Sequence, residues 1–200
     1  SPLKIYDMKK LVFATNNKNK VNEVRAILPS GFKLFSLKDI SCEEELPENQ
    51  DTLEGNALEK ANYLYDNYGY NCFSEDTGLE IKSLNNAPGV YSARYAGLQR
   101  SSEDNINKVL NDLKGVKDRR ARFRTVVALI MDGKRQLFEG VVEGEILNER
   151  EGVNGFGYDP IFKPDGYDHS FGLLDKKVKL EISHRTRAVS SLLNYLNSLK

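Results

Sequence analysis

Apolar residues along this chain occur either in short runs, which are typical of buried strands, or at helical spacing, which is typical of amphipathic helices. The continuous apolar run at residues 11–14 predicts a buried strand, the mainly apolar segment 32–37 predicts a second short strand, and a β-branched run at 123–131 predicts a strand at the centre of a sheet. Apolar residues at helical spacing predict helices over residues 21–28, 53–65, 102–114 and 188–199.

The longest apolar run leads into a hairpin signal. Asp132-Gly133 separates residues 123–131 from a second apolar run at 137–146, and this dipeptide is typical of a tight turn between antiparallel strands. The pattern therefore predicts a long antiparallel ribbon beside a mixed sheet.

Two acidic residues interrupt another apolar run. The strand predicted at Asn71–Ser74 delivers Glu75 and Asp76, and Leu79–Ile81 alternates like an edge strand after them. Adjacent carboxylates repel each other, and a divalent cation with hard oxygen ligands is a simple compensation. A solvated acidic turn with Gly78 at positive φ is the alternative.

A polar loop follows the first predicted strand. It runs from Thr15 to Lys20, contains no glycine and ends at a helix start. Backbone N–H groups at a helix N-terminus attract anions, so the loop is a candidate phosphate site. The alternative interpretation of the same residues is a capped helix whose lysines are exposed to solvent.

Glycines and aromatic residues alternate near the C-terminal third of the chain. Residues 152–164 read GVNGFGYDPIFKP, in which Phe156 and Tyr158 offer flat surfaces and Asp159 can accept from a nucleobase N–H group. The same loop could instead fill the core with its aromatic rings. His184 and Arg185 precede the last helix and could donate to a base carbonyl or a phosphate, or serve structure alone.

Composition narrows the class of protein. The 200 residues are 40% hydrophobic, with 29 basic and 29 acidic side chains, so the formal net charge is zero. This balance argues against a strongly basic nucleic-acid surface, and no apolar run is long enough for a membrane span. The two cysteines match no metal or disulfide pattern, which predicts reduced thiols in a cytoplasmic protein with Cys72 in its core. Residues 1–7 read as a remnant of cloning or a flexible extension, because Met8 resembles a natural start.

Six stretches, in the same order along the chain, resemble the inosine triphosphate pyrophosphatase family, also described as Ham1-like proteins. These stretches are Phe13–Lys20, Glu48–Ala61, Ser74–Leu79, Ala87–Tyr95, Gly155–Pro160 and Ile182–Arg185. The resemblance runs from about Met8 to the C-terminus.

The resemblance implies an α/β, inosine triphosphatase-like fold, in which a long mixed β-sheet is flanked by helices and two lobes enclose a central substrate cleft. Residues 8–200 would form one pyrophosphatase domain, assembled as a homodimer. The implied reaction is Mg²⁺-dependent, with Mn²⁺ as a substitute, and splits ITP, dITP or XTP into the monophosphate and pyrophosphate. Such an enzyme removes non-canonical purine nucleotides from the nucleotide pool.

The resemblance also implies residue roles. Asp76 would be the general base, and Asp76, Glu48 and Glu75 would bind the metal. Two departures bear on this set: many relatives have an aspartate where this chain has Glu75, and the glutamate-rich connector leaves Glu45 as an alternative to Glu48. The residues expected to bind substrate are Thr15, Asn16, Asn17, Lys18, Asn19, Lys20, Lys60, Thr77, Phe156, Gly157, Tyr158, Asp159, Lys179, His184 and Arg185.

Base selectivity has a physical basis within this set. Donors such as Lys179, His184 or Arg185 can reward the 6-keto group of hypoxanthine and xanthine, whereas the 6-amino group of adenine would leave a buried donor unpaired at a cost of roughly 1–3 kcal/mol. Guanine shares the 6-keto group, so its rejection would need a contrast at C2, such as a lack of room or of partners for the 2-amino group.

Two other functions fit the same motifs. One is a Maf-like pyrophosphatase that acts on other modified nucleotides. The other is a non-catalytic nucleotide-binding module, against which the acidic pair argues, because carboxylates repel phosphates unless a metal intervenes.

Overall fold

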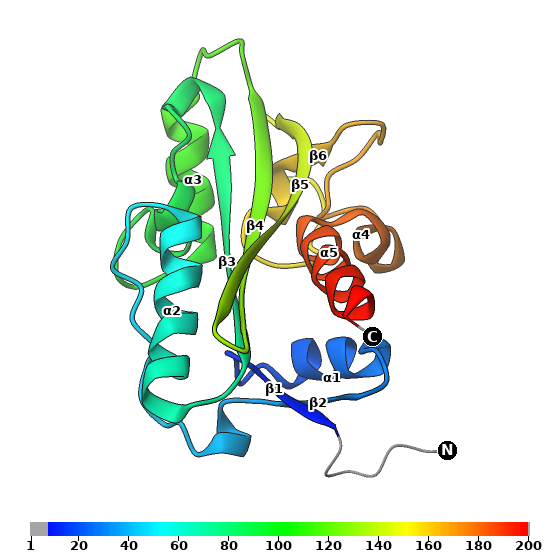
Figure 1. Cartoon of the computed structure of the whole chain (residues 1–200). Helices are drawn as coiled ribbons and strands as arrows, with labels where there is room; N and C mark the ends of the chain where they lie inside the picture. Colours follow the sequence, from blue (N-terminus) through cyan, green and yellow to red (C-terminus); the bar gives the residue numbers. More distant parts are fainter. Residues whose placement is uncertain (1–7, 200) are drawn as a thin grey trace. The chain divides into compact units, whose positions relative to one another are not determined.

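The computed structural model describes residues 8–199 and contains one mixed sheet with strand order β2-β1-β3-β4-β5-β6 (Figure 1). The expectation for residues 1–7 lies outside the described residues. β1 pairs in parallel with β2 and β3, while β5 pairs antiparallel with β6, which confirms the mixed sheet. The strands are β1 (Lys9–Phe13), β2 (Phe32–Phe35), β3 (Cys72–Ile81), β4 (Arg120–Met131), β5 (Lys134–Ile146) and β6 (Phe162–Pro164).

The helices confirm the 3.6-residue periodicity of the sequence. Side chains of Asn17, Thr52 and Ser101 cap the first three α-helices by accepting a backbone N–H from the first turn. The seven-residue helix α4 was not predicted, because it buries no residue and so carries no clear apolar stripe. The α-helices are α1 (Lys18–Ile27), α2 (Leu53–Tyr68), α3 (Ser102–Asp112), α4 (Lys176–Ile182) and α5 (His184–Ser198).

The chain folds into two compact units, in agreement with the expected two lobes. The first unit contains the chain up to Asp76, residues 126–138, and the chain from Ala188 onward. The second unit contains residues 77–125 and 139–187. The strands β3, β4 and β5 each contribute residues to both units.

Each unit has its own apolar core. In the first unit, residues of β1, β3 and β4 pack with α1 and α5, and the rings of Phe13 and Phe73 stack with centroids 4.4 Å apart. Cys72 is fully buried there, and burial raises the pKa of its thiol to about 12, which confirms a core role. In the second unit, Leu79 and Ile81 pack with α3 and with Phe162.

Three details of the sequence prediction are wrong. The acidic pair does not end one strand ahead of another: β3 runs without a break from Cys72 to Ile81. Leu79, Glu80 and Ile81 are all buried, so this segment is not an alternating edge strand. Leu199, predicted on the apolar stripe of the last helix, lies beyond the end of α5 and is half exposed.

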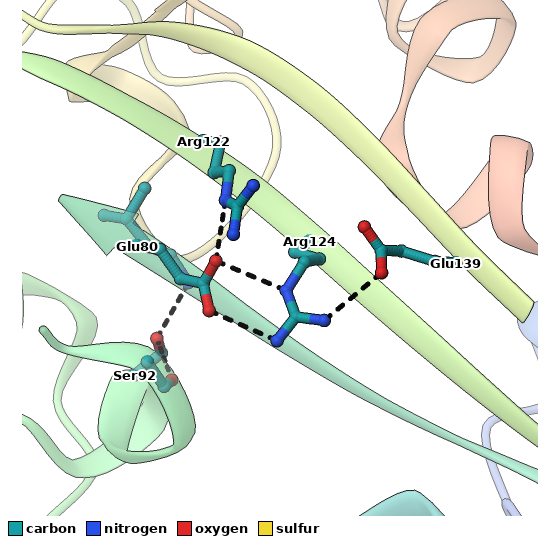
Figure 2. Close-up of polar contacts among 7 residues, drawn as sticks. Glu80, Ser92, Arg122, Arg124 and Glu139 are labelled. Carbon is teal, nitrogen blue, oxygen red and sulfur yellow. Dashed lines mark hydrogen bonds and ion pairs between the residues drawn. The ribbon is translucent and has the colours of Figure 1, made fainter. Parts of the chain in front are cut away.

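A buried carboxylate ties β3 to β4 within the second unit. Glu80 Oε1 accepts from Arg122 Nε at 2.8 Å and from Arg124 Nε at 3.3 Å, as Figure 2 shows. Arg124 also reaches Glu139 Oε2 of β5 at 3.4 Å. Glu80 and Arg124 are 8% and 9% exposed, so removing either one would take a close counter-ion from a buried charge.

This burial predicts a large stability cost for Glu80→Gln. We expect the unfolding free energy to fall by about 3–5 kcal/mol, because the buried Arg124 guanidinium loses the charge of a carboxylate that it contacts through two of its nitrogens. The matched control is Asp165→Asn, which breaks the Arg120–Asp165 pair, whose side chains are 45% and 53% exposed. That control should cost less than about 1 kcal/mol. Urea denaturation measures both, and equal costs for the two variants would contradict the expectation.

Candidate functional site

The polar loop after β1 is ordered by its own side chains. Thr15 Oγ1 accepts the backbone N–H of Asn17, and Asn17 Oδ1 accepts that of Lys20. Asn16 Oδ1 accepts the backbone N–H of Lys38, while Lys18 and Asn19 are exposed. The loop therefore presents the N-terminus of α1 and its partial positive charge in a fixed conformation. This geometry fits an anion, and it also fits the alternative of a capped helix.

Lys20 turns from this loop toward β3. Its ammonium lies 2.8 Å from Glu75 Oε1, and the two side chains are only 26% and 10% exposed. This ion pair compensates part of the electrostatic repulsion expected between the Glu75 and Asp76 carboxylates. The alternation of side chains along β3 reduces the repulsion further, since successive side chains of a strand point to opposite faces.

Lys60 of α2 links a second carboxylate to the same strand. Its Nζ lies 2.6 Å from Glu48 Oε1 and 2.6 Å from the main-chain oxygen of Glu75. Lys60 is 12% exposed, and Glu48 is the acidic residue of the connector that reaches it, whereas Glu45 is exposed. Of the two alternatives left by the sequence, the structure thus places Glu48 next to the acidic strand.

The oxygen atoms around these lysines are of the type that Mg²⁺ prefers. Two ammonium groups already lie against carboxylate and carbonyl oxygens, which shows that this surface of the first unit accepts positive charge. Across residues 8–199, however, no three His, Cys, Asp or Glu side chains are grouped to hold a metal ion by themselves. Mg²⁺ is commonly held by one or two carboxylates together with substrate phosphates, and the donors present fit that pattern.

Asp76 and Thr77 follow Glu75 at the middle of β3. Both are partly buried, and the boundary between the two units falls between them. Thr77 Oγ1 lies 2.7 Å from Thr125 Oγ1 of β4, within the second unit. Alternation places Asp76 on the same face of the strand as Ser74, whose hydroxyl contacts the main chain of α2.

A cavity of about 290 Å³ lies within the second unit. It brings together residues from β3, from the glycine-aromatic loop, and from α4 and α5, which are far apart in the sequence. All of the predicted site residues of this unit line it: Thr77, Phe156, Gly157, Tyr158, Asp159, Lys179, His184 and Arg185.

Asp159 is the buried carboxylate of this cavity. It is 2% exposed, and its Oδ2 accepts from Lys179 Nζ and from the backbone N–H of Phe156 at 3.0 Å. Burial raises the pKa of the Asp159 carboxyl, against the opposing effect of the Lys179 ammonium. The Lys179 ammonium also lies 4.3 Å from the centre of the exposed Phe156 ring. The pair fixes a donor and an acceptor beside a flat apolar surface.

His184 is the first residue of α5, and its imidazole is neutral. It is 6% exposed and stacks on Phe123 with centroids 4.8 Å apart. Burial, and then the positive charges of Arg185, Lys179 and Arg187, lower the pKa of His184 to about 3. Its Nδ1 is buried, and no hydrogen-bond partner for it occurs in the described part of the chain. A ligand in the cavity with a complementary group would satisfy this atom.

The two aromatic residues of the loop differ in their surroundings. Phe156 is 65% exposed, so its ring is available as a stacking surface. Tyr158 is 6% exposed, packs in the core of its unit, and donates its hydroxyl to the main-chain oxygen of Ser92 at 2.6 Å. Of the two open interpretations of this loop, Phe156 fits the ligand surface and Tyr158 fits the core, although one edge of Tyr158 lines the cavity.

Comparison with known proteins agrees with this arrangement. The family model described as the Ham1 family matches residues 11–195. This chain belongs to the Ham1 family. A dITP/XTP pyrophosphatase of Flavobacterium johnsoniae is 50% identical, over 96% of this chain and 100% of the relative. A dITP/XTP pyrophosphatase of Porphyromonas gingivalis is 48% identical, over 94% of this chain and 98% of the relative. The solved structure of the Staphylococcus aureus Ham1 protein superposes with a TM-score of 0.92 at 38% identity, over 96% and 100% of the two chains.

Three residues that line the cavity of this Ham1-family chain were not predicted from the sequence. These residues are Arg100, Ser102 and Asn105, and none belongs to a motif with obvious chemistry. Asn105 is 4% exposed, donates to the carbonyl of Ala93 and accepts the N–H of Ala96, so it fixes the turn that precedes α3. The sequence signal that could have indicated Asn105 is its place on the apolar stripe of α3, because a polar residue there is usually buried and hydrogen-bonded.

The neutral state of His184 predicts a pH dependence of stability. Below about pH 6.5 the unfolded chain binds a proton that folded His184 does not, so the folded state loses stability as pH falls from 6.5 toward 3. We expect the unfolding free energy to fall more steeply than in His184→Gln, by up to ~1.4 kcal/mol per pH unit between about pH 6 and 4. Urea denaturation at several pH values measures the two slopes. Identical slopes would show that His184 titrates normally in the fold.

Proposed function

We propose that this chain hydrolyses non-canonical purine nucleoside triphosphates, namely ITP, dITP and XTP, to the monophosphate and pyrophosphate. Its membership of the Ham1 family and its identity of about one half to relatives named dITP/XTP pyrophosphatase support this. The observation that carries the proposal is the cavity of the second unit. A flat exposed ring, a lysine–carboxylate pair and a neutral buried histidine occur together in it. Apolar walls with a few convergent polar groups are typical of small-molecule sites.

The cavity provides a physical basis for base selection. Phe156 offers its face for stacking, Asp159 can accept from a ring N–H group, and Lys179 can donate to a 6-keto oxygen. Adenine reverses the polarity at both ring positions, so it would leave a donor and an acceptor of the cavity unpaired. Each such mismatch costs roughly 1–3 kcal/mol, which corresponds to a preference of about 5-fold to 150-fold per group.

The first unit supplies groups for the triphosphate in this proposal. The N-terminus of α1, together with Lys20 and Lys60, would hold phosphate oxygens. Glu48, Glu75 and Asp76 would hold Mg²⁺, for which Mn²⁺ is the natural substitute. When bound, the metal would neutralise phosphate charge and lower the pKa of water. Asp76 would orient the attacking water and accept its proton as general base.

We further propose that the active form is a homodimer, and that the enzyme works in the cytoplasm on free nucleotides, without nucleic acid or membrane. Separately from this, no helix within residues 8–199 is long and apolar enough to cross a membrane.

Product analysis tests the proposed reaction. Phosphorus NMR of ITP with Mg²⁺ and the protein should show IMP and pyrophosphate growing in together, because the α–β anhydride bond is the one that breaks. Asp76→Asn should slow the reaction by roughly 10²- to 10⁴-fold, the usual contribution of a general base, while circular dichroism shows an unchanged fold. Orthophosphate and IDP as products would refute the pyrophosphatase proposal. Normal turnover by the Asp76→Asn variant would show that another residue is the general base.

A further inference from the structure

We propose that Lys20 and Lys60 act as internal counter-ions that position Glu75 and Glu48 before substrate binds, so that metal and triphosphate bind weakly alone and strongly together. This inference rests on the proposed function. It assigns the two lysines a positioning role in the free protein, in addition to contact with phosphate.

Two ion pairs lie within the first unit, and Lys60 links them through the main chain of Glu75. Lys20 Nζ is 2.8 Å from Glu75 Oε1, Lys60 Nζ is 2.6 Å from the main-chain oxygen of Glu75, and the same Nζ is 2.6 Å from Glu48 Oε1. Three of the four side chains are no more than 26% exposed, and Glu48 is 37% exposed. The two ammonium groups balance the charges of Glu48 and Glu75, and Asp76, the next residue of β3, adds one carboxylate.

Low exposure makes these partners hard to remove one at a time. A partly buried carboxylate that loses its lysine keeps its desolvation cost and loses the compensating attraction. The lysines face the same penalty in reverse. Any ligand that binds here must therefore replace the partner that it displaces.

A divalent metal alone meets two obstacles. It has to displace the lysine ammonium groups from the carboxylate oxygens that would be its own ligands, so metal and lysine compete for the same atoms. It also finds too few protein ligands, because the described residues provide no group of three or more acidic, His or Cys side chains arranged around one point. Oxygens of a triphosphate would complete the coordination shell, as they commonly do for Mg²⁺.

A triphosphate alone meets the opposite problem. It would draw Lys20 and Lys60 toward its own oxygens and leave Glu48 and Glu75 facing phosphate without counter-ions. When both ligands arrive, the lysines move to phosphate and the carboxylates move to metal, so every charge keeps a partner. Each ligand then raises the affinity of the other by the same factor, because linkage is reciprocal.

The test is a binding cycle with Mn²⁺ and an ITP analogue whose α–β bridging oxygen is replaced by methylene, so that no cleavage occurs. Free Mn²⁺ is followed by electron paramagnetic resonance, and nucleotide binding by calorimetry. The association of Mn²⁺ with the analogue in buffer is measured first and included in the cycle. In the wild-type protein we expect the analogue to tighten Mn²⁺ binding roughly 10- to 100-fold, within the usual range of coupling between sites.

Lys20→Met gives the discriminating result. Without the Lys20 ammonium, one cation fewer competes with metal for Glu75 Oε1, so Mn²⁺ alone should bind roughly 3- to 10-fold more tightly than to the wild type, while the analogue binds more weakly and the coupling factor falls. Lys10→Met is the matched control: it removes the same charge from an exposed position of β1 and should leave the cycle unchanged. Lys60→Met is the second variant, and circular dichroism shows which of the two retains the fold.

The outcomes separate this inference from the proposed function. Tighter metal binding in Lys20→Met or Lys60→Met supports the counter-ion role, even if product analysis shows no hydrolysis of ITP. Unchanged or weaker metal binding in both variants overturns it, even if ITP is hydrolysed. A wild-type protein that binds Mn²⁺ equally well with and without the analogue also overturns it.

Discussion

Charges that leave bulk water need partners, and this constraint organises the structure around β3. Lys20 and Lys60 approach the strand from α1 and α2, and their ammonium groups compensate Glu75 and Glu48. Their positions depend on local features of the sequence, since Asn17 caps the helix that carries Lys20 and Thr52 caps the helix that carries Lys60. The strand itself is anchored by Phe73 and Ser74, which are fully buried immediately before the acidic pair. Packing thus fixes the backbone from which the charged groups project.

The second unit obeys the same constraint with different residues. Glu80 is held by two arginines of β4, and Asp159 is held by Lys179. Glu80 and Arg124 are buried and join β3 to β4, whereas the Asp159–Lys179 pair lines the cavity beside Phe156 and can exchange part of its hydrogen bonding with a ligand. His184 shows the alternative solution to burial, which is to remain uncharged. Together these groups give the cavity a fixed pattern of donors and acceptors, which is what selection among purine bases requires.

Much of this arrangement could be read from the sequence, because it depends on local patterns. The capped helices, the hairpin at Asp132-Gly133 and the gathering of Asp159, Lys179 and His184 follow from periodicity, turn chemistry and family motifs.

The remaining features depend on tertiary contacts. The continuity of β3 through Glu75 and Asp76 could not be predicted, because Lys20 and Lys60, which neutralise Glu75 and contact its main chain, come from distant segments. The core position of Tyr158 likewise depends on Ser92, 66 residues away in sequence.

Competition between substrates in one reaction tests the central claim most directly, since the relative rates of consumption equal the ratio of kcat/KM values. The protein is given equal concentrations of ITP, ATP and UTP with Mg²⁺, and each nucleotide is followed by chromatography. The account predicts that ITP disappears at least about tenfold faster than ATP, because only the 6-keto base matches the donors of the cavity. Equal consumption of ITP and ATP, or faster consumption of UTP, would contradict it.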